Sequence, residues 1–130
     1  MNHFISNGVI TTKTGILKTL GNFYKQTERY YLNGIGVDDV IPTSFIISAC
    51  QEDHNYHRFV QRFNDLDKGK FRKEHLPEKH CHANWWLIKP ANMNQGKGIK
   101  VSNKLNDILN FIKIQQPNTP WVVQKYLERP

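Results

Sequence analysis

The stretch that decides the fold is NWWLIKPANMNQGKGIKV, which occupies residues 84–101. A strongly apolar run ends at Lys89, and a segment rich in Asn, Gln and Gly follows before the chain turns apolar again. This pattern predicts two short strands, at residues 85–89 and 99–102, with a loop at residues 90–98 between them. The loop has the length of a hairpin connection, so the two strands are expected to pair antiparallel.

The rest of the chain alternates helical and strand patterns around this hairpin. Apolar residues at helical spacing predict three amphipathic helices, at residues 13–26, 52–66 and 103–114. Short apolar runs predict two further strands, at residues 43–48 and 121–127. The resulting fold class is mixed α/β (α+β). The apolar faces consist of Ile16, Leu17, Leu20, Phe23 and Tyr24 in the first helix, Tyr56, Phe59, Val60 and Phe63 in the second, and Leu105, Ile108, Leu109 and Ile112 in the third.

The composition is compatible with a partner that carries negative charge, and equally with a basic surface that is merely solvated. The chain has 130 residues and a formal net charge of +7, from 18 Lys+Arg against 11 Asp+Glu. Such an excess attracts nucleic acid, nucleotide phosphates or an acidic protein. A run of about 18 apolar residues, which a membrane-spanning helix needs, does not occur. The two cysteines, Cys50 and Cys81, and a start without an export signal favour reduced thiols in the cytosol.

The glycine loop has the residue types of a phosphate site. Gly96 and Gly98 free the backbone to approach a ligand closely, and successive N–H groups in such a loop form a concavity that binds anions. Lys97 and Lys100 add positive charge, while Lys89 ends the strand that leads into the loop. These features suggest a triphosphate held under the hairpin. The loop matches neither the pattern of a Rossmann unit nor that of a P-loop. A plain hairpin turn without a ligand is therefore the alternative.

Two spaced motifs resemble a known family. The block WWLIKPANMNQGKGIKV, followed after a short helix by WVVQKYLERP, is similar to the nucleotide-binding centre of the tubulin–tyrosine ligase-like family. Upstream, NHFISNGVITTKTGILKTLGNFYK resembles the family's N-terminal segment, and VIPTSFIIS resembles its Leu-Pro-x-Thr-type strand. The resemblance touches most of the chain except residues 65–83. It implies a partial ATP-grasp fold with a mixed sheet.

The resemblance implies roles for eight residues. Lys89 matches the family lysine that binds ATP phosphates. Gln95 and Gly96 match a dipeptide at the loop tip that touches ATP, and Gly98 lies in the same loop. In the family, position 95 also approaches the acceptor protein; relatives often carry Arg there. The family also has a hinge strand that borders adenine and offers it backbone groups and an apolar wall. The residues that match this strand are Gln124, Lys125, Tyr126 and Leu127.

The same resemblance implies a reaction and its partners. Such ligases add tyrosine, glutamate or glycine to tubulin or to another acidic acceptor protein. ATP phosphorylates a carboxylate, an amine attacks the acyl phosphate, and Mg²⁺ accompanies the ATP. The implied partners are therefore ATP, Mg²⁺, a free amino acid and the acceptor protein, rather than a membrane or nucleic acid. The implied location is the cytoplasm and its cytoskeleton, with the cilium and the basal body as further places.

Comparison with the family also predicts that this chain is an N-terminal part of a ligase. Relatives continue past the Arg-Pro of ERP with a Lys-Phe-Asp-Leu-Arg-like strand, and later with acidic Mg²⁺ ligands. Catalytic residues and metal ligands are thus expected beyond Pro130, and we expect no ligase activity from the chain alone. Without a second lobe, the strand at residues 121–127 is expected to be an uncovered edge.

Three regions are expected along the chain. Residues 1–64 form the N-terminal segment of the ligase-like domain, and residues 65–83 form a basic flexible insertion. Residues 84–130 form the incomplete nucleotide-binding core. The two tryptophans at the start of this core, Trp85 and Trp86, are expected to point to opposite faces of a strand.

Two other classes of function are compatible with the residues. A zinc site could use four of seven side chains, although no C-x-x-C pair is present. These candidates are Cys50, His54, His57, His75, His80, Cys81 and His82. A nucleic-acid-binding module without catalysis could use the basic loop at residues 68–79. The aromatic residues at core-facing spacings argue against that module, because they are expected to pack inside; they are Phe59, Phe63, Trp85 and Trp121.

Overall fold

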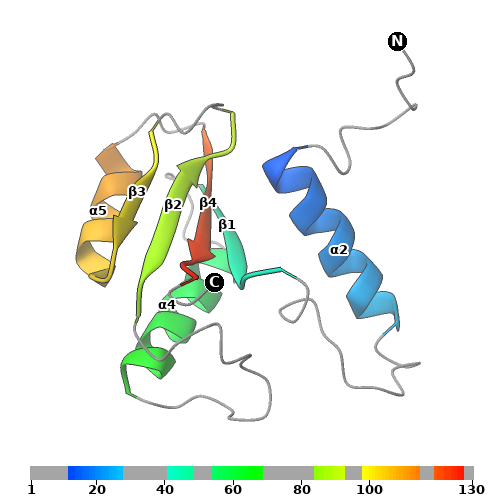
Figure 1. The fold of residues 1–130 in the computed structure, drawn as a ribbon, viewed down its shortest axis with the longest axis horizontal. Helices are drawn as coiled ribbons and strands as arrows, with labels where there is room; N and C mark the ends of the chain where they lie inside the picture. Colours follow the sequence, from blue (N-terminus) through cyan, green and yellow to red (C-terminus); the bar gives the residue numbers. More distant parts are fainter. Residues whose placement is uncertain are drawn as a thin grey trace.

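The computed structural model describes residues 12–27, 41–48, 54–68, 84–92, 98–114 and 119–127. These residues form an α+β arrangement of three helices and a four-stranded sheet (Figure 1). The elements are α2 (Lys13–Thr27), β1 (Ser44–Ser48), α4 (His54–Asp67), β2 (Trp86–Pro90), β3 (Lys100–Ser102), α5 (Leu105–Ile114) and β4 (Pro120–Lys125). The predicted fold class is confirmed, and the sheet is compatible with part of an ATP-grasp fold. The apolar patterns placed each element to within two residues.

The described strands form an antiparallel sheet with the order β1-β4-β2-β3. The expectation of a mixed sheet is therefore wrong for these four strands, because none of them pairs in parallel. The predicted antiparallel hairpin of β2 and β3 is confirmed, with Leu87 opposite Val101. The expectation that the last strand is an uncovered edge is wrong, because β4 pairs with β1 on one side and with β2 on the other. Its side chains at Val122 and Val123 are accordingly buried on both faces of the sheet. Among the described strands, β1 and β3 are the edges.

One face of the sheet is covered by α4 and α5, and the core lies between them and the strands (Figure 1). Alternate residues of β1 and β2 point into this core, as a half-buried strand requires. The rings of Phe45, Phe59 and Trp86 form its centre, with Phe59 and Trp86 centroids 5.1 Å apart and tilted edge to face. The predicted apolar faces of both helices are confirmed, since Phe63 and Ile108 are buried with their neighbours.

The helix α5 begins where its sequence predicts. Ser102 precedes the helical pattern, and its hydroxyl oxygen accepts a hydrogen bond from the Lys104 N–H at 3.2 Å. This bond satisfies an N–H group that the first turn leaves without a partner in the helix. Asp107 in the first turn and Lys113 in the last turn carry charges opposite to the partial charges of the helix dipole at those ends, which is the favourable arrangement. The start of α5 is therefore set by local sequence.

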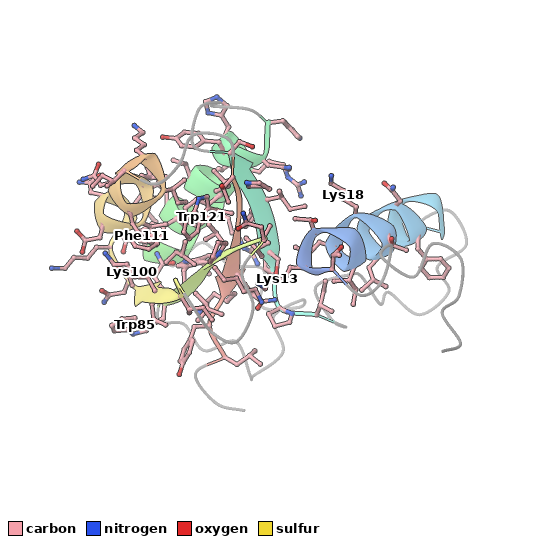
Figure 2. All side chains as sticks on the ribbon, turned by 90° about the horizontal axis from the view of Figure 1, so that it is seen from above. Lys13, Lys18, Trp85, Lys100, Phe111 and Trp121 are labelled. Carbon is pink, nitrogen blue, oxygen red and sulfur yellow. The ribbon has the colours of Figure 1, made fainter. Side chains whose placement is uncertain are left out.

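The helix α2 stands apart from this core. In Figures 1 and 2 it lies on the side of the sheet away from α5. Its sequence has an apolar face, yet none of its described side chains is buried; Ile16 is 37% and Phe23 is 54% exposed. The first turns of α2 border a cavity instead. Within the described ranges, no helix is long and apolar enough to cross a membrane.

Candidate nucleotide-binding site

The face of the sheet opposite the core carries the candidate site. Strand alternation turns Trp86 and Ile88 into the core and therefore turns Leu87 and Lys89 to the other face. The register places Leu87 beside Gln124, and Lys89 beside Val122. We call this surface the open face. It is where the sequence predicts Lys89 to meet phosphate oxygens.

A cavity of about 330 Å³ lies between the open face and the first turns of α2. Its volume falls within the range of small-molecule sites, which starts near 300 Å³. Two lysine side chains reach it, Lys89 from β2 and Lys13 from α2, and the described lining includes no carboxylate. We call this cavity the lysine cleft. It is lined by Thr12, Lys13, Ile16, Leu17, Ile41, Pro42, Lys89, Val122 and Gln124.

The Lys89 ammonium is held in the lysine cleft by a side chain from β4. Its Nζ donates a hydrogen bond to Oε1 of Gln124 at 3.0 Å. The other end of that amide, Nε2, donates to Oγ of Ser44 at 3.0 Å, and this hydroxyl donates to the carbonyl of Pro42 at 2.7 Å. The structure thus brings together two residues that the sequence assigned separately to the phosphate end and to the adenine end of the site.

Lys13 is the functional candidate that sequence reasoning missed. It is the first residue of α2, after Thr12, whose hydroxyl accepts from the Gly15 N–H at 3.0 Å. Its Nζ donates to the Pro90 carbonyl at 2.9 Å, across 77 positions of sequence. No spacing rule connects residues so far apart, so only the tertiary fold could place Lys13 beside Lys89. The upstream resemblance covered this residue without giving it a role.

The environment lowers the pKa of Lys89 below its ordinary value of 10.5. The larger cause is burial, which disfavours the charged form, and the second is repulsion by the Lys13 ammonium. An anion between the two lysines would oppose both effects, because its negative charge stabilises each ammonium group. The lysine cleft therefore suits an anion better than a neutral molecule.

We expect Lys13→Ala to raise the pKa of Lys89 toward 10.5 without restoring it fully, because burial still acts. The measurement is an NMR titration of the lysine Cε and Nζ signals, with Lys89→Ala used to assign the resonance. Lys18→Ala is the matched control, since Lys18 is an exposed lysine of the same helix (Figure 2). An equal pKa of Lys89 in wild type and Lys13→Ala would show that the two ammonium groups do not interact.

The end of β4 carries the other predicted ATP contacts. Lys125 is buried, and its Nζ donates to the carbonyls of Trp85 at 3.2 Å and Tyr126 at 3.3 Å. The N–H of Tyr126 donates to the same Trp85 carbonyl at 3.0 Å. Tyr126 and Leu127 are 44% and 39% exposed. Trp85, which was expected inside, is 38% exposed beside them, because the fully buried Trp86 takes the core position. The role of these residues toward adenine stays a prediction.

The glycine loop is described only at its end. Gln95, Gly96 and Lys97 lie outside the described residues, so their roles stay predictions. Gly98 has a φ of 74°, a left-handed conformation that glycine adopts without strain. Lys100, which was expected to add charge at the glycine loop, lies on the opposite face of the sheet from Lys89. Strand alternation puts Lys100 beside the core, with Nζ 5.0 Å from the centroid of the Phe111 ring (Figure 2).

The residues of the two alternative functions lie mostly outside the described ranges. Of the zinc candidates, His54 and His57 are described, and both are exposed on α4. No group of three or more His, Cys, Asp or Glu side chains in the described part could hold a metal ion. Of the basic loop at residues 68–79, only Lys68 lies within the described residues.

The comparisons with known proteins agree with the resemblance of the two motifs. The model of the tubulin-tyrosine ligase family matches residues 1–130, which is the whole chain. The chain therefore belongs to the tubulin-tyrosine ligase family.

Individual relatives match in different ways. Tubulin glycylase 3C of Tetrahymena thermophila is 45% identical over 74 residues, covering 57% of this chain and 6% of that protein. Tubulin monoglycylase TTLL3 of Danio rerio is 44% identical over 51 residues, covering 37% of this chain and 7% of that protein. The protein named Probable tubulin polyglutamylase ttll-9 in Caenorhabditis elegans is 24% identical, with 98% of this chain matched to 27% of its length. The chain thus matches only a small part of each of these proteins.

Proposed function

We propose that this chain forms the nucleotide-binding part of an ATP-dependent ligase that joins an amino acid to tubulin. The observation that carries the proposal is the lysine cleft, where Lys89 and Lys13 face one cavity on the open face of the sheet. Family membership and the names of the relatives support tubulin as the acceptor and glycine or glutamate as the amino acid. With tubulin as acceptor, the reaction takes place on the cytoplasmic cytoskeleton, including cilia and basal bodies.

In this proposal the two lysines hold the polyphosphate of ATP. The acceptor carboxylate attacks the γ-phosphorus, the bond to the β-phosphate oxygen breaks, and ADP leaves. The amine of the incoming amino acid then attacks the acyl phosphate, and inorganic phosphate leaves as the amide forms. Lys89 and Lys13 neutralise charge on the phosphates during the first step, which is the main task of a protein in phosphoryl transfer.

The remaining predicted contacts complete the proposed site. The exposed side chains of Tyr126 and Leu127 offer an apolar surface to adenine beyond the end of β4. Backbone groups for the base are assigned to Leu127, because the N–H and the carbonyl of Tyr126 already bond to Trp85 and Lys125. Gln95 and Gly96 are assigned to the loop over the phosphates, with Gln95 also facing the acceptor protein. Mg²⁺ would neutralise further charge on the ATP; the described residues hold no acidic cluster for it.

Nucleotide binding is tested by calorimetric titration of the protein with ATP, adenosine and inorganic triphosphate. We expect ATP to bind more tightly than adenosine, because the lysine cleft binds the phosphates. Triphosphate is expected to compete with ATP for this cleft. Failure of ATP to bind, together with salt-sensitive retention of RNA or DNA, would favour the nucleic-acid-binding alternative. Stoichiometric zinc in the purified protein would favour the zinc alternative.

The ligation reaction is tested with this protein, tubulin, ATP and either radiolabelled glycine or radiolabelled glutamate. ATP binding without incorporation is the result we expect for residues 1–130 alone. Incorporation of one amino acid would identify the substrate and would overturn the expectation that the chain is inactive by itself. Both amino acids are included in the assay, because proteins named as glycylases and as a probable polyglutamylase match the chain.

A further inference from the structure

We propose that Ser44 is a positioning residue for Lys89. Its hydroxyl fixes the side-chain amide of Gln124, so that the amide oxygen holds the Lys89 ammonium toward the lysine cleft. The inference rests on the proposed function, because it assigns Ser44 to the phosphate end of the nucleotide site. Ser44 itself does not line the cleft and acts through Gln124.

The directions of the three hydrogen bonds determine one another. The Ser44 hydroxyl has a single proton, and it donates that proton to the Pro42 carbonyl at 2.7 Å. Its oxygen is then left to accept, so the group that faces it at 3.0 Å must be the NH₂ of Gln124. The amide oxygen consequently points the other way, toward Lys89. A lysine ammonium only donates hydrogen bonds, so this is the amide orientation that it requires.

The antiparallel register makes this arrangement possible. Ser44 of β1 is the direct partner of Gln124 of β4, and Leu87 of β2 is the partner of Gln124 on the other side. Lys89 is therefore the diagonal neighbour of Gln124, within reach of a long side chain. The central strand β4 thus links an edge strand to the lysine across three strands of the open face.

Removal of the Ser44 hydroxyl leaves the Gln124 NH₂ without its acceptor, so the side chain of Gln124 is no longer fixed and samples other rotamers. In those rotamers the amide oxygen lies away from Lys89, which then loses the acceptor that compensates for its burial beside Lys13. We expect the pKa of Lys89 in Ser44→Ala to fall further below 10.5. The affinity for ATP should fall roughly 3- to 10-fold, as for the loss of one ordinary hydrogen bond, while adenosine binds unchanged.

The experiment measures two quantities in four single variants and one double variant. The pKa of Lys89 comes from NMR of labelled lysine side chains, and the dissociation constants of ATP and adenosine come from calorimetry. Ser44→Thr keeps the hydroxyl and is expected to restore wild-type values. Ser48→Ala is the matched control, since Ser48 lies on the same strand and the same face, opposite Pro120. The fourth variant, Gln124→Met, removes the middle of the chain of hydrogen bonds.

A double-mutant cycle decides whether Ser44 acts through Gln124. We expect the pKa of Lys89 in Ser44→Ala/Gln124→Met to equal that in Gln124→Met alone, because the hydroxyl has no amide left to orient. Shifts in the pKa of Lys89 that add in the double variant would overturn the inference. The inference would also be overturned if Ser44→Ala kept the wild-type pKa of Lys89 and the wild-type affinity for ATP. Failure of Ser44→Thr to restore both quantities would overturn it as well.

Failure of this inference is distinguishable from failure of the proposed function. If the wild-type protein does not bind ATP, the proposed function fails, and the pKa of Lys89 still decides the role of Ser44. If the wild-type protein binds ATP and Ser44→Ala matches it in both measurements, only the inference fails. If Ser44→Ala does not fold, Gln124→Met is compared with wild type and with Ser44→Thr instead. An unchanged pKa of Lys89 in Gln124→Met then overturns the inference.

Discussion

Replacement of Lys89 by alanine is expected to weaken ATP binding roughly 10- to 100-fold, because charge-assisted hydrogen bonds contribute about 1.5–3 kcal/mol each. The ammonium lies on the open face of the sheet, with Gln124 as its acceptor and Lys13 across the cleft. Adenosine has no phosphates to contact Lys89, so its affinity should not change. Calorimetric titration of both compounds measures the difference, and thermal unfolding checks that the variant is folded.

The control for this prediction is Lys113→Ala. Lys113 is an exposed lysine in the last turn of α5, which covers the opposite face of the sheet. Its loss changes the net charge by the same amount and leaves the lysine cleft intact. Equal losses of ATP affinity in both variants would mean that the nucleotide responds to overall charge. Unchanged ATP affinity in Lys89→Ala would place the phosphates elsewhere and would remove the basis of the proposed function.

Replacement of Trp86 by alanine is expected to have the largest effect on stability, a loss of about 3–5 kcal/mol in the free energy of unfolding. Trp86 is fully buried at the centre of the core, where its ring contacts Phe45 and Phe59. Its indole N–H donates to Oδ1 of Asn84 at 2.7 Å, and that bond is lost as well. Domains have about 5–15 kcal/mol of stability in total, so the variant is expected to be close to unfolding at ordinary temperature.

The neighbouring tryptophan provides a matched control. Trp85→Ala removes the same side chain from the next residue of the chain, but Trp85 is 38% exposed. We expect a loss of no more than about 1 kcal/mol, as is usual for partly exposed positions. Urea titrations followed by circular dichroism give both values without relying on tryptophan fluorescence, which either substitution alters. Similar losses in the two variants would contradict the assignment of Trp86 to the core.

Much of the fold could be predicted from local patterns. The helical spacing of apolar residues located α4 and α5, and their buried faces at Phe59 and Ile108 are those predicted. Strand alternation predicted that Trp85 and Trp86 point to opposite faces, but not which of them enters the core. That choice follows from the packing of Phe45 and Phe59 around one position, and no local pattern contains that information.

The candidate site was predictable only in part. Lys89 was found because it ends an apolar strand before a glycine loop, and Gln124 because it lies in a motif that resembles the family's hinge strand. Their contact with each other was not predicted, because it depends on β4 pairing directly with β2. For α2, the sequence pattern predicted more packing than the structure shows. The helix has the apolar face of a packed helix, but none of its described side chains is buried in a core, and of its apolar residues Ile16 and Leu17 border the lysine cleft.

By itself the sequence determined the kinds of elements, their ends, the antiparallel hairpin and the family. The elements and the hairpin follow from the spacing of residues that are near neighbours in the sequence. The family follows from two motifs whose order can be compared directly with the order in relatives. Tertiary structure alone decided that Lys13 meets Pro90 across 77 positions, and that Ser44 meets Gln124 across 80. The physical reason is that such contacts follow from the order of strands in the sheet. That order is chosen by burial of the whole core, not by the residues that later share a hydrogen bond.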